Sequence, residues 1–268
     1  MKTWFITGAS RGLGRQFAAA ALARGDRVAA TARTPPTLDH FAERYGAAFL
    51  PLQLDITERA ASVRALKDAY EHFEGLDVVV NNAGYTHFGF VEEVSEREVR
   101  AQFETDFFGT LWLTQTAVSL LRSQGSGHIV QISSTSGATA FPMTGLYSAA
   151  KWALEGMSEA LAQEVAMFGI KVTIVEPGAY ATDARGESAV HSQPIAAYDP
   201  IRQMISDSMG ELVVGDPGDA AQALLEVVDA EEPPLRLLMG SPGYDMVTDV
   251  AKQRLETWQA WEALAREV

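Results

Sequence analysis

The chain contains no cysteine. This absence excludes disulfide bonds, thiolate nucleophiles and the thiolate ligands of structural zinc sites. The five histidines are scattered along the chain without the spacing of a metal-binding motif, so we expect no metal site. Because proteins of the reducing cytosol rarely use disulfides, the sequence also predicts a cytoplasmic location.

Positive charge is scarce as well. Lys and Arg number 21 against 35 Asp and Glu, which gives a formal net charge of −14 at pH 7. Because an acidic surface repels phosphate backbones, we expect no nucleic-acid partner. An anionic cofactor would still bind wherever a local pocket of basic residues opposes the overall charge.

Long apolar runs are missing too. No uninterrupted apolar segment approaches the roughly 20 residues that a membrane-spanning helix needs. The first residues, MKTWFITGAS, lead directly into a strand and a glycine turn, which is not the pattern of a secretory signal. We therefore expect no membrane partner.

Short apolar segments alternate with longer segments of helical periodicity. Several of the short ones, such as 78–80, are apolar on both faces, as parallel strands covered by helices on both sides are. The expected strands are 3–7, 27–32, 48–55, 76–83, 127–134, 171–176 and 235–239. The expected helices cover about 13–24, 58–73, 96–122, 146–168, 217–229 and 245–265, with N-caps at Thr57, Ser95 and Asp216 and a C-cap at Gly169.

This alternation predicts an α/β fold. We expect a doubly wound, Rossmann-type parallel sheet of about seven strands in a single domain over residues 1–268. The one break in the rhythm is about 179–215, which mixes Gly, Ser, Pro and Asp with scattered apolar residues. Because ligands of such sheets bind beyond the carboxyl ends of the strands, this segment is predicted to be a substrate lid.

A glycine-rich loop, TGASRGLG, follows the first expected strand. In this arrangement Gly8 permits a tight turn and Gly12 lets the backbone approach a pyrophosphate. Gly14 lets the following helix pack close to the strand. Three glycines also occur in structural turns, but their place between a strand and a helix favours a dinucleotide site.

The end of the second expected strand indicates which dinucleotide binds. NAD sites usually place a carboxylate there to bind both ribose hydroxyls, whereas this chain has Ala32 followed by Arg33. A second arginine, Arg11, lies in the glycine loop. Two guanidinium groups without a carboxylate suit the 2′-phosphate of NADP(H), although two solvated surface arginines would look the same.

A tyrosine and a lysine lie four residues apart in the segment YSAAK. Tyr147 and Lys151 would therefore share one face of a helix. A phenol is a poor base at neutral pH, but a nearby cation favours its phenolate form. The shift that is needed corresponds to roughly 4 kcal/mol, which the ammonium and the positive charge of a nicotinamide could supply. The spacing alone is common, so the context decides.

That context is a set of further motifs at the ends of expected strands. They are Asn81-Asn82-Ala83-Gly84 after the fourth strand, Ser133-Ser134 at the end of the fifth, and Pro177-Gly178 with Thr182 after the sixth. Together with the glycine loop and the Tyr-Lys pair, these residues resemble the short-chain dehydrogenase/reductase family in its one-domain form. The resemblance is close over about 1–183, and beyond that it extends only to the general layout.

The resemblance implies a hydride-transfer mechanism. Tyr147 would exchange the proton of a carbonyl/alcohol pair, Ser134 would donate a hydrogen bond to its oxygen, and Lys151 would hold the nicotinamide ribose. Asp55 would bind the adenine amino group and Thr182 the carboxamide. The complete set of expected cofactor contacts is Gly8, Ser10, Arg11, Gly12, Leu13, Gly14, Arg33, Asp55, Ile56, Asn81, Ala83, Gly84, Tyr147, Lys151, Pro177, Gly178 and Thr182.

One position departs from the family pattern. The family usually has Asn three residues before the glycine of the central helix, where it helps to hold a water that links the lysine to solvent. This chain has Asp106 there. An ionised carboxylate accepts hydrogen bonds but cannot donate them; beside Lys151 it would stabilise the ammonium or be protonated itself. Asp106 is therefore the fourth candidate catalytic residue, and the relay step is left open.

The expected substrate pocket is largely apolar and has no cluster of positive charge. Its candidate residues are Ser136, Ala140, Phe141, Met143, Leu146, Tyr180 and Met204. This composition favours an uncharged carbonyl compound or secondary alcohol with an apolar body, such as a ketone, an aldehyde or a steroid-like molecule. The packing of a lid would explain the same residues.

The two longest expected helices carry more apolar side chains than one sheet face can cover. These side chains are Phe103, Phe107, Trp112, Trp152 and Met157. A twofold interface of the kind that the resemblance implies would bury them, so we expect a homodimer or homotetramer.

The sequence thus predicts an NADP(H)-dependent oxidoreductase that transfers a hydride between the nicotinamide and a carbonyl or secondary alcohol. The alternative is a catalytically weak NADP(H)-binding regulator. The intact Tyr147–Lys151 pair argues against that alternative, and Asp106 argues weakly for it. A third hypothesis, an epimerase or dehydratase with bound cofactor, fits less well because that branch is longer and spaces its first glycines differently.

Overall fold

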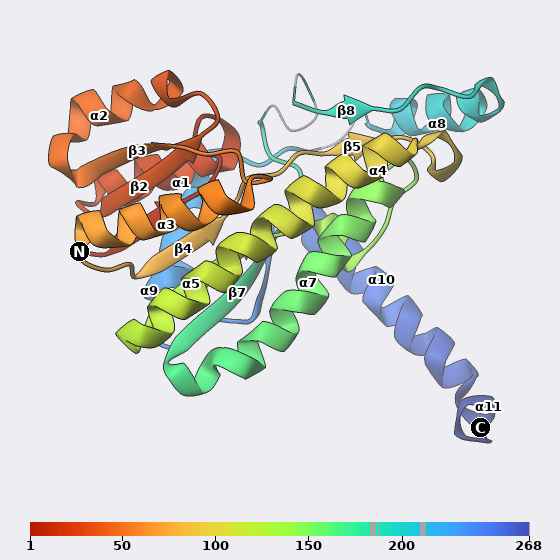
Figure 1. Ribbon diagram of the computed structural model, residues 1–268. Coiled ribbons are helices and arrows are strands. Elements are labelled where there is room, and N and C mark those ends of the chain that lie inside the picture. Colours follow the sequence, from red (N-terminus) through yellow and green to blue (C-terminus); the bar gives the residue numbers. More distant parts are fainter. Residues whose placement is uncertain (183–185, 187, 210–212, 268) are drawn as a thin grey trace.

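The computed structural model describes residues 1–182, 186, 188–209 and 213–267. Its centre is a seven-stranded parallel sheet in the order β3-β2-β1-β4-β6-β7-β9, flanked by helices (Figure 1). The strands are β1 (Thr3–Ile6), β2 (Arg27–Ala32), β3 (Phe49–Gln53), β4 (Val78–Asn81), β6 (Gly127–Ile132), β7 (Ile170–Pro177) and β9 (Arg236–Met239). The predicted doubly wound Rossmann-type fold is confirmed.

Helices cover both faces of the sheet, because both faces of its strands are apolar. On one face lie α1 (Gly12–Ala23), α2 (Asp39–Tyr45) and α9 (Pro217–Asp229). On the other lie α3 (Arg59–Phe73), α5 (Thr110–Gln124) and α7 (Gly145–Val165). The remaining helices are α4 (Glu96–Phe103), α6 (Thr135–Ala138), α8 (Asp199–Met209), α10 (Ser241–Ala260) and α11 (Glu262–Glu267).

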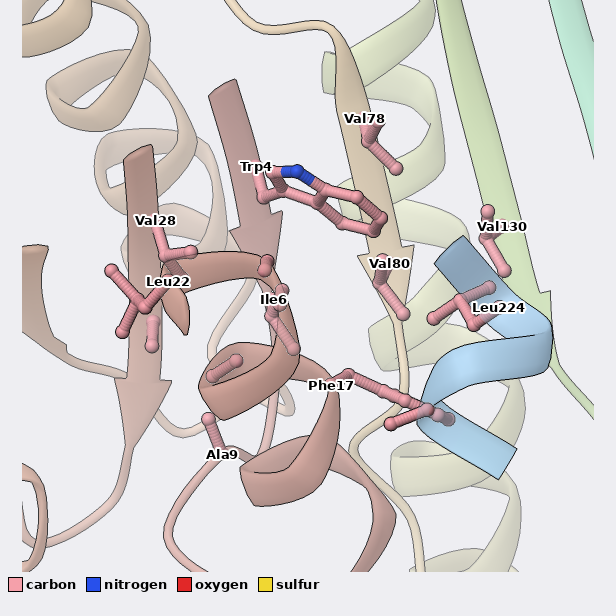
Figure 2. Packing of buried hydrophobic residues seen from close by; sticks show 14 of the residues in the cluster. Trp4, Ile6, Ala9, Phe17, Leu22, Val28, Val78, Val80, Val130 and Leu224 are labelled. Carbon is pink, nitrogen blue, oxygen red and sulfur yellow. The ribbon is translucent and has the colours of Figure 1, made fainter. Parts of the chain in front are cut away.

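The alternation of side chains along each strand produces two hydrophobic cores. Trp4 and Ile6 of β1 belong to the core beneath α1 and α9, where Phe17 and Leu224 pack with them (Figure 2). Phe5, between them in the sequence, belongs to the opposite core beneath α3 and α5. This two-sided burial is why the strands read as continuous apolar runs rather than as alternating ones.

Two of the three predicted N-caps are found where they were expected. Ser95 forms a reciprocal capping box with Glu98 before α4, and Asp216 accepts a backbone hydrogen bond before α9. Thr57 was the wrong choice, because the N-cap of α3 is Glu58. The Thr57 hydroxyl instead donates to the Asp55 carboxylate at 2.8 Å in a local turn.

The long helix that we expected over 96–122 is interrupted. Between α4 and α5 the backbone forms a π-helical turn over Glu104–Gly109. A π-helical turn inserts an extra residue into the helix and often occurs at a functional site. The helix expected over 146–168 is α7, followed by a short 3-10 turn that Gly169 closes at φ 71°.

The lid predicted over 179–215 contains two elements that the periodicity did not reveal. These are β8 (Val190–His191), which pairs with β5 (His87–Phe88), and α8. Residues 183–185, 187 and 210–212 of the predicted lid lie outside the described residues. The part that contains β8 and α8 lies beside the segment around β5 (Figure 1), whereas Tyr180 and Gly215 pair with each other beyond the end of β7.

Large apolar side chains stay exposed on several of the described helices. Trp152 of α7 is 44% exposed, and Trp258 and Trp261 near the end of the C-terminal helices are 69% and 64% exposed. Helix α10 starts beside α6 and extends away from the sheet (Figure 1). None of the described helices is long and apolar enough to cross a bilayer.

Candidate active site

The predicted site residues gather at the carboxyl ends of the parallel strands. The glycine loop follows β1, Ala83 and Gly84 follow β4, Ser134 follows β6, and Pro177 is the last residue of β7. The strand order reverses between β1 and β4, and in open sheets of this kind ligands bind in a crevice at such a switch point. Residues up to about 170 positions apart in the chain therefore share one edge of the sheet.

The glycine loop is held by the residues that follow β4. The side-chain amide of Asn82 donates to the carbonyl oxygens of Thr7 and Gly8 at 2.8 and 3.2 Å. A Cβ on Gly8 would lie 2.9 Å from the Cα of Ala83, and one on Gly14 would collide with the Asn82 amide. These two glycines are thus required for close packing, and Asn82 is a residue whose role in the site our sequence reasoning missed.

Gly12 has a different role. It begins α1 with φ 58°, and among the described residues a Cβ there would meet only Thr182, at 3.8 and 3.9 Å. The N-cap residue Arg11 makes no side-chain cap hydrogen bond, so the first backbone N–H groups of α1 have no side-chain cap. Open space beside uncapped N–H donors fits the diphosphate of a dinucleotide.

Arg11 and Arg33 flank this crevice, and both are exposed. Within the described residues neither guanidinium pairs with a carboxylate. Ala32, at the end of β2, is buried and offers no acceptor for a ribose hydroxyl. The geometry leaves both guanidinium groups available to an anionic ligand.

Asp55 is exposed at the end of β3, and Ile56 beside it is buried. One carboxylate oxygen of Asp55 accepts from the backbone N–H and the hydroxyl of Thr57, at 3.0 and 2.8 Å. Ile56 packs under Gly109, where a Cβ would come within 2.8 Å of its side chain. These contacts fix the orientation of Asp55 at the crevice.

The candidate catalytic side chains meet at the end of β6. Lys151 is buried on α7, and its Nζ donates to the carbonyl oxygen of Ile132 at 3.0 Å. The same Nζ lies 5.7 Å from the centre of the Tyr147 ring. Ser134 caps α6, with its hydroxyl oxygen accepting from the Ser136 backbone N–H at 3.1 Å. The structure thus places the ammonium near the phenol, and it bonds the ammonium to the carbonyl of Ile132, two residues before Ser134.

Asp106 lies in the π-helical turn and is fully buried. One of its oxygens accepts from the Tyr85 backbone N–H at 3.1 Å, and the other accepts from the side-chain amide of Gln102. Gln102 also donates to the Tyr85 carbonyl oxygen at 3.1 Å. Gln102 precedes Asp106 by four residues, so helical spacing could have indicated this partner.

Asp106 is also close to Lys151. A Cβ on Gly84 would lie 2.7 Å from an Asp106 oxygen and 3.5 Å from the lysine Nζ, so both groups approach the same side of this glycine. Burial raises the pKa of Asp106 to about 6, against the opposing effects of Lys151 and of the two hydrogen bonds. Burial, followed by the charges of Asp106 and Glu98, raises the pKa of Tyr85 to about 12. Asp106 can therefore change its charge near neutral pH.

The described part of the lid is anchored to the segment around β5. Glu93 accepts from the Ile195 backbone N–H at 2.8 Å and pairs with Arg202. The rings of Phe90 and Tyr198 stack at 4.6 Å. The loop between Ser134 and Tyr147 is also tied here, since the Gly89 backbone N–H donates to the Met143 carbonyl oxygen at 2.8 Å.

The residues predicted to line a substrate pocket differ in exposure. Ser136 and Leu146 are buried, and Phe141, Met143 and Tyr180 are half-buried. Ala140 and Met204 are exposed, and Met204 lies on the solvent side of α8 with 69% of its surface exposed. Met143 has φ 68°, which is uncommon for a residue with a side chain and marks local strain near the site.

Comparisons with known proteins give a consistent result. The sequence matches the model of the family described as short chain dehydrogenase over residues 2–192. The oxidoreductase BOA17 of Botryotinia fuckeliana is 39% identical over 98% of both chains. The NADPH-dependent 3-dehydrocapnine reductase of Ornithobacterium rhinotracheale is 33% identical over 72% of this chain and 71% of that protein.

A solved structure is similar over the whole chain. The short-chain dehydrogenase from Streptomyces avermitilis shares 40% of its sequence with this chain and has a TM-score of 0.92. The match covers 100% of this chain and 99% of the other. The similarity therefore includes the lid segment and the C-terminal helices.

Proposed function

The chain belongs to the short-chain dehydrogenase family and is an oxidoreductase of that family, and on this basis we propose that it is an NADP(H)-dependent carbonyl reductase or alcohol dehydrogenase. The observation that carries the proposal is the buried Lys151, whose Nζ lies beside the Tyr147 ring and donates to the Ile132 carbonyl, two residues before Ser134. The crevice with the glycine loop opens along the same edge of the sheet.

We propose the following roles for the side chains. The cofactor, when bound, supplies or accepts the hydride. Tyr147 gives a proton to the carbonyl oxygen in reduction and takes it from the alcohol in oxidation. Ser134 donates a hydrogen bond to the same oxygen, since its hydroxyl proton is not used in any hydrogen bond within the described residues. Lys151, held by the Ile132 carbonyl, places a positive charge beside the phenol.

The proposed cofactor is NADP(H) rather than NAD(H). The exposed Arg11 and Arg33 can bind a 2′-phosphate, and Ala32 cannot bind two ribose hydroxyls. The name of the NADPH-dependent relative supports this choice. We propose that the remaining predicted residues, from Asp55 to Thr182, also contact the cofactor, because they lie at the same edge of the sheet.

The proposed substrate is an uncharged ketone, aldehyde or secondary alcohol with an apolar body. Leu146, Phe141 and Met143 lie on the loop and helix that join Ser134 to Tyr147. These side chains offer apolar contact and no charge for a substrate phosphate or carboxylate. Because a hydrophobic surface discriminates weakly between related apolar bodies, we expect activity on several carbonyl compounds.

NADPH consumption with a panel of ketones and aldehydes tests the proposal. The panel pairs each apolar compound with a carboxylated analogue of similar size. We expect consumption with the apolar members and little with their analogues. Tight NADPH binding without turnover of any member would instead favour the regulator hypothesis, for which the Asp106 substitution is the one structural argument.

We also propose that the chain self-associates and is located in the cytoplasm. Trp152 is 44% exposed, and Phe103, Phe107, Trp112 and Met157 are only half-buried in a single chain. A twofold interface between the outer faces of α5 and α7 would cover them. Light scattering should give at least twice the 29.0 kDa chain mass, and a monomer at micromolar concentration would contradict this part of the proposal.

A further inference from the structure

A buried ionic network lies directly behind the candidate catalytic residues. We define it by Ser133, which directly follows β6, and by Glu155 of α7, Glu176 of β7 and Arg236 of β9. The side chains of Glu155 and Glu176 are 5% and 3% exposed. Carboxylates are almost never buried to this extent unless they are paired.

The contacts of the network form a continuous chain. The Ser133 hydroxyl donates to Glu155 Oε1 at 2.6 Å. The other oxygen of Glu155 pairs with Arg236, whose Nη1 also donates to Glu176 at 2.8 Å. In the sheet, Arg236 lies opposite Ile174, so Glu176 projects from the same face two residues further along.

Each member of the network lies next to a part of the proposed active site. Glu155 follows Lys151 and Tyr147 on α7 by one and two turns, so the three share a helix face. Ser133 immediately precedes Ser134. Glu176 immediately precedes the Pro177-Gly178 pair of the crevice.

Gly137 has no side chain, and this leaves the space in which Glu155 and Ser133 meet. A Cβ at this position would collide with the Oε1 of Glu155 and with the Ser133 hydroxyl. Its φ is not in the left-handed region, so the glycine is needed for clearance and not for backbone conformation. The short helix α6 after Ser134 can therefore lie directly on Glu155.

The charge balance shows that the network is not simply a stabilising ion pair. Two buried carboxylates, and the half-exposed Glu159 as a third, share the one guanidinium of Arg236. Burial and the charge of Glu155 raise the pKa of Glu176 to about 6. Buried ion pairs of this kind often add little net stability, and apolar residues would fill the space as well.

We propose that Glu155 and Arg236 are positioning residues for catalysis. Through the network they set the separation between Ser134, after β6, and the Tyr147–Lys151 pair on α7, and they tie both to the end of β7. The inference rests on the proposed function, because it assigns the network to that same proton-transfer site. It adds residues that do not touch the reacting atoms but hold those that do.

The test compares Glu155→Gln with Glu159→Gln. Both variants remove one carboxylate charge from Arg236, but only Glu155 also contacts Ser133. We expect Glu155→Gln to lower kcat by about tenfold to a hundredfold, since small misplacements of reacting groups have effects of this size. The Kd for NADPH and the KM for the carbonyl substrate should stay within about twofold, and Glu159→Gln should behave as wild type.

Two further measurements separate positioning from loss of folding and from failure of the proposed function. The double variant Ser133→Ala/Glu155→Gln should lose less than the product of the single losses, because both residues act through one hydrogen bond. Hydrogen exchange of the NADPH-bound protein should be faster at the peptides around 133–136 and 145–151 in Glu155→Gln, and unchanged in Glu159→Gln.

The exchange measurement needs no turnover, so it tests the inference even if no carbonyl compound is a substrate. Wild-type protein without turnover would overturn the proposed function alone. Equal kcat and equal local exchange in the two Gln variants would overturn the inference. The inference would also be overturned if the lower activity of Glu155→Gln were fully explained by a lower unfolding temperature or by weaker NADPH binding.

Discussion

Replacing Asp106 by Asn is the most informative single change in this site. The two side chains have the same shape, but Asn cannot carry a charge. Asp106 is fully buried beside Lys151 and accepts hydrogen bonds from Tyr85 and Gln102. The substitution therefore removes a buried titratable group and leaves the packing of the π-helical turn in place.

The effect on stability can be worked out from the pKa. Burial raises the pKa of Asp106 from its ordinary 3.8 to about 6 in the folded chain. This difference in pKa corresponds to about 3 kcal/mol. Above pH 6, ionisation of the buried carboxyl group lowers the stability of the folded state by about this amount. Because the folded state binds this proton more tightly, the cost appears as the pH rises from about 4 to about 6. Asp106→Asn should remove it.

Part of this gain will be lost to hydrogen bonding. If the new amide keeps its oxygen toward the Tyr85 N–H, its NH₂ group faces the NH₂ group of Gln102. Gln102 must then turn its own oxygen, which has no partner within the described residues, toward the new donor. That rotation gives up the bond to the Tyr85 carbonyl, at a cost of about 1 kcal/mol. We expect a net stabilisation of about 2 kcal/mol at pH 8 and a small loss below pH 4.

Urea unfolding of both proteins between about pH 4 and 8 checks this expectation. Asp26→Asn is the matched control with the opposite sign. Burial raises the pKa of Asp26, but hydrogen bonds from Lys2, Arg24 and Trp4 outweigh burial and hold that pKa below its usual value. Its ionised form therefore stabilises the fold above about pH 4, and Asp26→Asn should lose stability at pH 8. An Asp106→Asn protein that is less stable than wild type at pH 8 would refute the reasoning.

The same variant tests the role of Asp106 in turnover. A negative charge beside Lys151 weakens the positive field that favours phenolate at Tyr147, so removing it should preserve or raise the turnover rate. The rate is measured at saturating NADPH from about pH 5 to 10. A loss of about tenfold or more, about 1.4 kcal/mol in the barrier, would show that the carboxylate takes an active part in proton transfer.

Three more changes give direct expectations. Arg33→Ala should weaken NADPH binding by about 10- to 100-fold through loss of a charge-assisted hydrogen bond, with NADH binding unchanged; equal wild-type affinity for the two cofactors would contradict the NADP(H) assignment. Tyr147→Phe should keep NADPH affinity and lower turnover by about 10²–10⁴-fold, and turnover within a few-fold of wild type would exclude Tyr147 as the proton donor. Gly137→Ala should lower the unfolding temperature by several degrees, because its Cβ meets Glu155 and Ser133; an unchanged melting curve would show that α6 can move aside.

The sequence alone was sufficient for the fold class and for the prediction that the site lies at the carboxyl edge of the sheet. Strand and helix periodicities are local properties, and parallel strands bring their carboxyl ends to one edge whatever their order. Tyr147 and Lys151 could be paired from their spacing on one helix. The N-cap Ser95 could likewise be identified because its capping box spans only four residues.

Features that depend on competing partners needed the tertiary structure. Thr57 has the chemistry of an N-cap, but the Asp55 carboxylate is nearer and takes its hydroxyl, so α3 begins after Glu58. The helix over 96–122 shows no signal for the π-helical turn that places Asp106, because that turn is defined by its packing. In the lid, our sequence reasoning missed α8, although its 11 residues have a clear apolar face.

The network behind the site shows this division most clearly. Arg236 binds carboxylates 60 and 81 positions earlier in the chain. The sequence around each of these residues does not indicate which partner it binds. Which charges meet depends on the neighbouring positions of β7 and β9 in the sheet and on the side of α7 that faces them. Local residue chemistry determined the fold class and indicated the candidate catalytic pair. Only the tertiary structure decided which buried charges compensate one another, because the interaction of two charges depends on their distance in space and not on their separation in sequence.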